Sequence, residues 1–190
     1  MRAGIMRSAE RLFCKHGFAA ATTRQIALAA GVATGTVFNY FPTKDDLGLA
    51  LIREHLASAE RDYARRRRGD ESLAEDLFCY LWACLKQLRA QRSFAGEVLQ
   101  RASLPGQAPG LNSSSSALPL LNTVTAILAR HGVAASAVDV HLFTALWAGI
   151  ASFWSRDKSK DQEDTMVVVD RSMLLFADHV LKEGPGNEIR

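Results

Sequence analysis

Side chains that bind phosphate groups and base edges gather near the start of this 190-residue chain. The guanidinium of Arg24 can bind a phosphate or, through two parallel hydrogen bonds, a guanine. The hydroxyl of Tyr40 and the ammonium of Lys44 suit phosphate oxygens, which set position without reading sequence. Gly35 and Thr36 are small enough to allow a close approach, and the Thr36 methyl can pack on a thymine methyl. These residues favour a surface for duplex DNA.

The net charge of +3 is unevenly distributed along the chain. Residues 1–44 hold six lysine and arginine side chains against Glu10 alone, and the remainder has a slight acidic excess. Positive charge concentrated on one segment is what a phosphate-binding surface requires. The charge distribution therefore supports a nucleic-acid partner for the same segment.

A short helix over residues 25–30 is predicted to position the first of these groups. Its apolar residues Ile26, Ala27 and Ala30 fall on one face. Thr22 and Gln25 have the spacing of a capping box at its start. Gly31 then supplies a left-handed residue for a tight turn.

A second short helix is predicted over residues 34–40. Val37 and Phe41, four residues apart, anchor it from below. Its opposite face carries small and polar side chains. Two helices joined in this way form a helix-turn-helix, whose second helix enters the major groove.

Residues 17–47 resemble the DNA-binding domain of the tetracycline-repressor (TetR) family of bacterial regulators, and the resemblance covers roughly residues 3–52. Its spacing is unbroken, whereas the rest of the chain shares only a helical pattern with the family. The residues that carry it are Gly17, Phe18, Thr22, Thr23, Arg24, Gln25, Ile26, Ala27, Ala30, Gly31, Val32, Gly35, Thr36, Val37, Phe38, Tyr40, Phe41, Pro42, Thr43, Lys44 and Leu47.

The resemblance implies a set of DNA contacts on the two short helices and just after them. Phe38 stands where the family often has tyrosine, so its contact would be apolar or stacking. Ala33 stands where the family favours a serine N-cap, so Thr34 is an alternative cap. The implied contacts are Thr23, Arg24, Thr34, Gly35, Thr36, Phe38, Asn39, Tyr40 and Lys44.

The whole chain reads as an all-α protein of about nine helices, without strand alternation. A first helix over about residues 3–16 should end in a Schellman-type cap at Gly17 and Phe18. Thr43, Ser72 and Ser136 are expected N-caps. A loop is expected over residues 104–116. The other helices are expected at about 44–66, 72–91, 94–102, 118–130, 136–157 and 164–182.

The helix around residues 138–154 is apolar over nearly its whole circumference, so both of its sides must be buried. One side can pack on the core and the other on a second subunit. The resemblance implies a dimer made by this helix and the last one; the alternative is a core helix in a monomer. A strip of small residues is expected at the interface: Ala145, Ala148, Gly149 and Ser152.

Aromatic side chains on later helices are candidates for the wall of a ligand cavity, although an ordinary core has the same composition. Because of the resemblance, we expect a pocket for an apolar or amphipathic small-molecule inducer of unknown identity. The candidates are Phe78, Trp82, Phe94, Phe143 and Trp147.

The Arg65–Arg68 run would lie about 30 Å from Lys44 at ~1.5 Å per helical residue, so we interpret it as a solvated helix end.

No catalytic or metal site is predicted. The three cysteines and five histidines lack metal-ligand spacing, and no carboxylate pair is placed for catalysis. We therefore expect no enzyme activity, no cofactor and no metal. We see no signal peptide and no segment of transmembrane length, and so expect a cytoplasmic protein without a membrane partner.

These features predict a DNA-binding domain over residues 1–47, with the helix-turn-helix at about 22–41, a ligand-binding and dimerisation domain over 48–183, and a tail over 184–190. The favoured function is a homodimeric repressor that binds a pseudo-palindromic duplex operator and is released by a ligand. One alternative is a nucleoid-associated or architectural DNA-binding protein without an inducer. Another is an all-α ligand-binding or scaffolding protein that no longer binds DNA.

Overall fold

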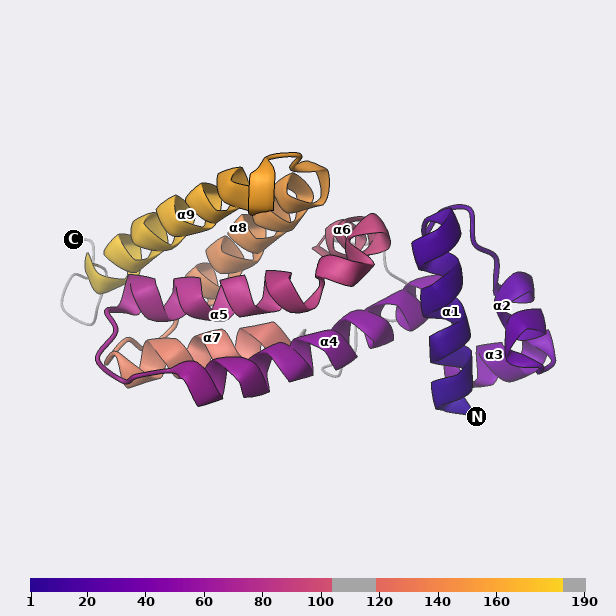
Figure 1. The fold of residues 1–190 in the computed structure, drawn as a ribbon. Coiled ribbons are helices and arrows are strands. Elements are labelled where there is room, and N and C mark those ends of the chain that lie inside the picture. Colours follow the sequence, from indigo (N-terminus) through magenta and orange to yellow (C-terminus); the bar gives the residue numbers. More distant parts are fainter. Residues whose placement is uncertain (104–118, 183–190) are drawn as a thin grey trace.

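The computed structural model describes residues 1–103 and 119–182, and within these ranges the fold is all-α, as predicted (Figure 1). The expected loop at 104–116 and the tail at 184–190 lie outside the described residues. Two short 3₁₀ turns cover Arg89–Gln91 and Lys160–Gln162. The α-helices are α1 (Arg2–His16), α2 (Thr23–Ala30), α3 (Thr34–Tyr40), α4 (Lys44–Arg66), α5 (Leu73–Gln87), α6 (Arg92–Ser103), α7 (Pro119–Arg130), α8 (Ala137–Arg156) and α9 (Glu163–Lys182).

The predicted helix starts are confirmed by side-chain caps. Thr22, Thr43, Ser72 and Ser136 each accept a hydrogen bond from the backbone three residues later, and each is completed as a capping box. Each pair satisfies two backbone donors that a helix start otherwise leaves unpaired. Local sequence therefore sets these four boundaries.

Two helix ends differ from their predictions. Phe18 packs on Phe13 with ring centroids 4.9 Å apart, but Gly17 has φ 82° and ψ 161°, so α1 does not end in a Schellman motif. The Schellman pair of bonds instead forms at Gly31, where Val32 N–H donates to the carbonyl of Ala27. The helix expected to reach residue 91 ends earlier, at Gln87.

The helices form an elongated molecule with α1, α2 and α3 at one end (Figure 1). Helix α4 leads away from that end and packs against α5 and α7. Helices α8 and α9 lie on the other side of α5. One continuous set of buried apolar side chains runs through both parts, from Ile5 on α1 to Val180 on α9.

Helix α6 is the second element, besides α4, that joins the two parts. The ring of Phe94 on α6 lies 5.3 Å from that of Phe13 on α1. On its other side α6 packs closely on α8: a Cβ atom built at Gly96 would lie 2.2 Å from the Cβ of Ser155. Only glycine allows this separation of the two helices.

Helix α8 is long and apolar enough, by length and composition alone, to cross a membrane, so the expectation that no segment has this length is wrong. A core helix of a packed bundle passes the same test, and α8 packs against α6 and α9. Only 33% of its most apolar window is buried within the single chain. Trp147 and Trp154 face the core, while Ala145 and Gly149 are exposed.

Gly96→Ala should lower the free energy of unfolding by about 1–3 kcal/mol, because the new methyl must displace α8. Ser155→Gly in the same chain should restore part of the loss. Gly4→Ala is the matched control, since a Cβ at Gly4 meets open space. Thermal and urea unfolding measure the change, and equal stability of the Gly96 and Gly4 variants would contradict the close contact.

Candidate nucleic-acid interface

Helices α2 and α3 are held at the end of the molecule by apolar side chains that point inward. Ile26 on α2 and Val37 on α3 are buried, and Phe41 closes the core just after α3. Helix α3 has only seven residues, so it depends on this packing for its stability. The packing leaves the other side of α3 facing solvent.

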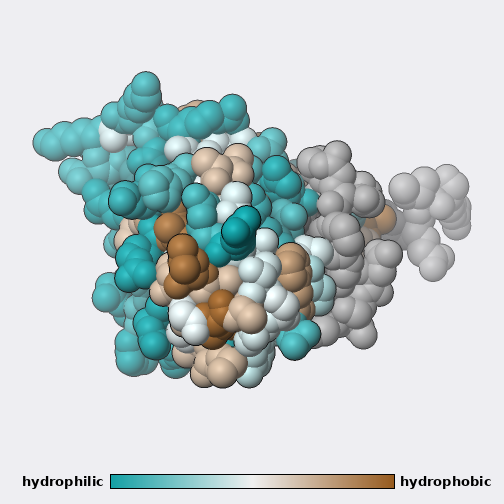
Figure 2. All heavy atoms as spheres, turned by 90° about the vertical axis from the view of Figure 1, so that its right-hand side faces the viewer, coloured by the Kyte–Doolittle hydropathy of each residue, from teal (hydrophilic) through white to brown (hydrophobic). Residues whose placement is uncertain are grey.

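The predicted contact residues are all accessible on these helices or just after them. Phe38 and Tyr40 are 45% and 44% exposed. Figure 2 looks onto this end of the molecule, where apolar and neutral residues are bordered by hydrophilic ones. The exposed set is Arg24, Gly35, Phe38, Asn39 and Tyr40, and the half-buried set is Thr23, Thr34, Thr36 and Lys44.

The start of α3 leaves its surface open to a partner. The N-cap is Ala33 and not Thr34, and it provides no side-chain hydrogen bond. A Cβ atom at Gly35 would meet nothing within 4 Å. The major groove of a DNA duplex could therefore approach the first turn of α3 without displacing protein atoms.

Two accessible residues near this surface were missed by the sequence reasoning. Leu28 lies one helical turn after Arg24 on α2 and is 83% exposed. Its position off the buried face of α2 could have identified it. Arg2 lies with its guanidinium 5.2 Å from the centre of the Phe41 ring, beside the end of α3. Only the tertiary fold brings Arg2 there.

The ammonium of Lys44, a predicted phosphate contact, is hydrogen-bonded within the protein. Its ammonium donates to the backbone carbonyls of Phe18, Ala19 and Ala21 at 2.8, 3.1 and 3.1 Å. It also lies 4.7 Å from the centre of the Phe18 ring. All three donors of the ammonium are used inside the protein. Lys44 thus ties the start of α4 to the loop between α1 and α2.

Residues 5–51 match the family described as bacterial regulatory proteins, tetR family. Over these residues the chain carries a domain of this family. The match covers both helices of the candidate interface and the first turns of α4.

The chain is similar to curated regulators over part of its length. It is 32% identical to the HTH-type transcriptional repressor AcnR of Corynebacterium glutamicum over 117 residues, which cover 56% of this chain and 61% of the relative. It is 33% identical to the HTH-type transcriptional regulator HbdR of an Aromatoleum species over 88 residues, covering 46% and 38%. The chain thus spans less than two thirds of each relative, and both relatives are regulators of transcription rather than enzymes.

Solved structures share the fold of nearly the whole chain at low sequence identity. Thermus thermophilus FadR, a TetR-family repressor solved with lauroyl-CoA, has a TM-score of 0.74 at 22% identity, covering 99% of this chain and 100% of that one. A TetR regulator from Rhodococcus sp. RHA1 has a TM-score of 0.70 at 19% identity, covering 92% and 93%. The likeness extends beyond residues 5–51 to the helices that follow.

Lys44→Met keeps most of the apolar stem but removes three hydrogen bonds, so it should lower the free energy of unfolding by about 1–3 kcal/mol. The loss should appear without DNA, in thermal unfolding of the free protein. Lys15→Met, at an exposed site on α1, is the matched control. A Lys44 variant as stable as the control, yet weakened in DNA binding, would restore the phosphate-contact interpretation.

Proposed function

We propose that this protein is a dimeric transcriptional regulator that binds duplex DNA through α2 and α3 and is released by a small molecule. The main support for DNA binding is the α3 helix, which is anchored by buried residues and presents small, aromatic and polar groups to solvent. Its position within the tetR-family match supports the proposal. The curated relatives are repressors and regulators of transcription, and the cytoplasm is the compartment that such a role requires.

The proposed contacts divide by chemistry. Arg24 and Thr36 read bases, Tyr40 binds phosphate, and Phe38 and Leu28 offer apolar contacts. The remaining predicted positions, Thr23, Thr34, Gly35 and Asn39, line the same helices. Lys44 stays in the proposal as the residue that positions the surface rather than one that touches DNA.

The second subunit is proposed to cover the exposed apolar side of α8 and α9. A shallow hollow of about 550 Å³ on this side is lined by Gly149, Ser152 and Phe153. Large apolar side chains on α8 and α9 are also exposed, as expected for a surface covered in a dimer. These side chains are Val138, Leu142, Phe153, Met166, Val167, Leu174, Leu175 and Leu181.

The proposed domain boundary near residue 47 lies inside α4, the helix that connects the DNA-binding domain to the following helices.

The five aromatic residues predicted to line one inducer pocket do not gather around a single described cavity. Phe94 packs on Phe13 at the junction, and Phe143 packs edge-on to Phe176. Trp147 is 1% exposed, and its indole N–H has no hydrogen-bond partner among the described residues. The proposal of ligand release is supported by FadR, a repressor of the same fold that was solved with lauroyl-CoA.

Binding to duplex DNA from the intergenic region beside the gene should weaken steeply as salt rises, because phosphate contacts release counterions. Affinity should fall by at least ~10-fold between 50 and 200 mM salt if three or more phosphates are contacted. Fluorescence anisotropy at several salt concentrations measures the slope. A flat response would refute DNA binding through a basic surface.

Arg24→Ala and Thr36→Ala should each relax the preference for particular bases. Arg24→Ala should also weaken binding to the preferred duplex by about 1–3 kcal/mol. Arg61→Ala is the control for charge, because Arg61 lies toward the end of α4 that is away from the interface. Competition between duplexes with substituted bases measures the preference. Equal weakening on every duplex would assign Arg24 to phosphate instead.

Gly149→Arg should convert the dimer to a folded monomer that binds operator DNA poorly. A Cβ at Gly149 meets nothing within 4 Å in the single chain, so the arginine is accommodated until a partner covers it. Gly149→Ala is the control. Sedimentation measures the mass and circular dichroism the fold, and an unchanged dimer would place the interface elsewhere.

A further inference from the structure

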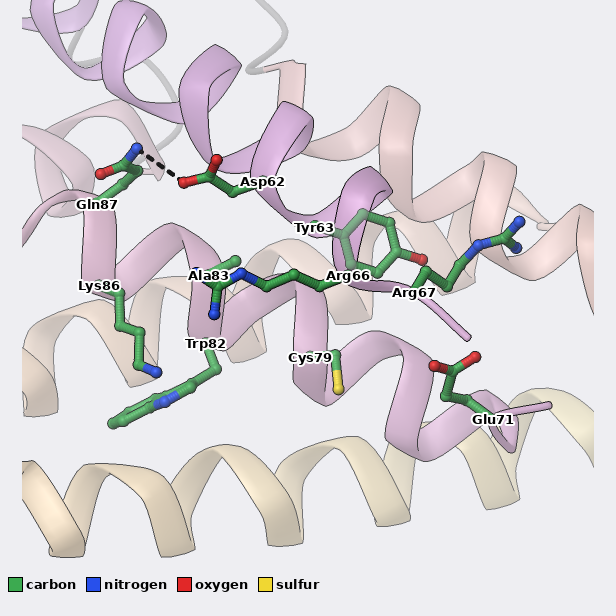
Figure 3. Close-up of a pocket in the computed structure, with 10 residues that line it drawn as sticks. All are labelled: Asp62, Tyr63, Arg66, Arg67, Glu71, Cys79, Trp82, Ala83, Lys86 and Gln87. Carbon is green, nitrogen blue, oxygen red and sulfur yellow. Dashed lines mark hydrogen bonds between the residues drawn. The ribbon is translucent and has the colours of Figure 1, made fainter. Parts of the chain in front are cut away.

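A solvent-facing cleft of about 350 Å³ lies between the last turns of α4 and the outward side of α5 (Figure 3). Its volume is in the range of pockets that bind small organic molecules. Tyr63 and Arg66 contribute from α4, and Trp82 and Lys86 from α5. The cleft is far along α4 from the candidate nucleic-acid interface, about 33 Å from Lys44 to Arg66 at ~1.5 Å per residue.

The cleft has a surplus of positive charge. Arg66, Arg67 and Lys86 line it, and within residues 1–103 and 119–182 none of the three has an ion-pair partner. Figure 3 shows Arg66 extending from α4 toward Ala83 on α5. Arg66 and Arg67 are exposed at the end of α4, as expected for a solvated helix end, and they also line this cleft.

The two carboxylates that line the cleft are already bonded to groups other than Arg66, Arg67 and Lys86. Asp62 pairs with Arg65 and accepts a hydrogen bond from the Gln87 amide at 3.4 Å. Glu71 accepts from the backbone N–H groups of Arg68 and Gly69, both at 2.7 Å. The Arg68 N–H, with that of Gly69, lowers the pKa of Glu71 to about 2, so this carboxylate stays ionised and bonded. Neither acid is free to neutralise Arg66 or Lys86.

An aromatic wall stands beside these cations. The rings of Trp82 and Phe78 are stacked, with centroids 6.3 Å apart and planes 13° from parallel. The Lys86 ammonium lies 5.8 Å from the centre of the Trp82 ring. A flat apolar group can therefore lie against Trp82 while an attached anion binds Lys86 and Arg66.

We infer that this cleft binds a small organic anion with a flat aromatic body, such as an aromatic carboxylate, and that its occupancy alters DNA binding through α4. The inference rests on the proposed function and gives it a site and a ligand class. Of the five predicted wall residues, only Trp82 lines this cleft.

The back of the cleft connects to the packing of α4. Tyr63 is buried and donates to the Asp76 carboxylate on α5. Asp76 also accepts hydrogen bonds from Arg130 and His131, both at 3.1 Å, at the end of α7. An anion drawn between Arg66 and Lys86 changes the spacing of α4 and α5 next to this cluster. Because α4 is one continuous helix, its other end carries the change to α3.

The test uses 1-naphthoate as the probe, with the neutral 1-naphthalenemethanol and inorganic phosphate for comparison. Calorimetry on the full-length protein should detect naphthoate binding at least ~10-fold tighter than either comparison compound. The Trp82 indole N–H resonance, assigned with Trp82→Phe, should shift on binding. Arg66→Ala and Lys86→Ala should each weaken naphthoate at least ~10-fold, and Arg61→Ala, on the same helix outside the cleft, should not.

Naphthoate should also weaken operator binding, and operator should weaken naphthoate by the same factor. Arg66→Ala should abolish this effect while leaving operator affinity without naphthoate unchanged. The inference is overturned if naphthoate fails to bind or binds Arg66→Ala as well as the wild type. It is also overturned if naphthoate leaves operator affinity unchanged in a protein whose salt-dependent DNA binding is intact. If the wild-type protein without ligand does not bind DNA, the proposed function is refuted instead.

Discussion

The position of the nucleic-acid interface depends on one helix that is fixed at both of its ends. At the start of α4, the Lys44 ammonium donates to three carbonyls of the loop between α1 and α2. Near its end, Tyr63 donates to the buried Asp76, which Arg130 also binds. Hydrogen bonds of charged groups are stronger than neutral ones, and these two sites make α4 a rigid connection. The start of α4 is thus bonded to the loop that leads into α2.

Helix α6 gives the same interface a second support. Gln91, just before α6, donates to Glu10 on α1 at 2.8 Å, and Glu10 in turn contacts His55 on α4 at 2.8 Å. Arg101 near the end of α6 pairs with Asp45 at 3.6 Å. The opposite side of α6 meets α8 at Gly96 with no space for a methyl group. The proposed dimer helix and the interface are thus linked through one close-packed element.

The parts of the fold that were predicted from the sequence are those set by local interactions. Capping pairs such as Thr43 and Asp46 act over three residues, and α3 begins and ends where its spacing predicts. The end of α5 was missed because the chain turns at Leu88 to bring Gln91 to Glu10, a contact 81 residues apart. The internal hydrogen bonds of Lys44 were missed for the same reason, since only the fold brings the loop carbonyls to its ammonium. The aromatic residues could not be assigned because core and ligand wall share one composition.

Selection of bound duplexes from a random pool, followed by sequencing, tests whether a dimer places its two α3 helices on one operator. Two α3 helices related by a two-fold axis must reach successive major grooves, about 34–36 Å apart. We expect an inverted repeat with half-site centres about 10 base pairs, or a multiple of that, apart, and a relaxed base preference within each half-site for Arg24→Ala. Recovery of no motif, or of a single half-site bound by one subunit, would contradict it.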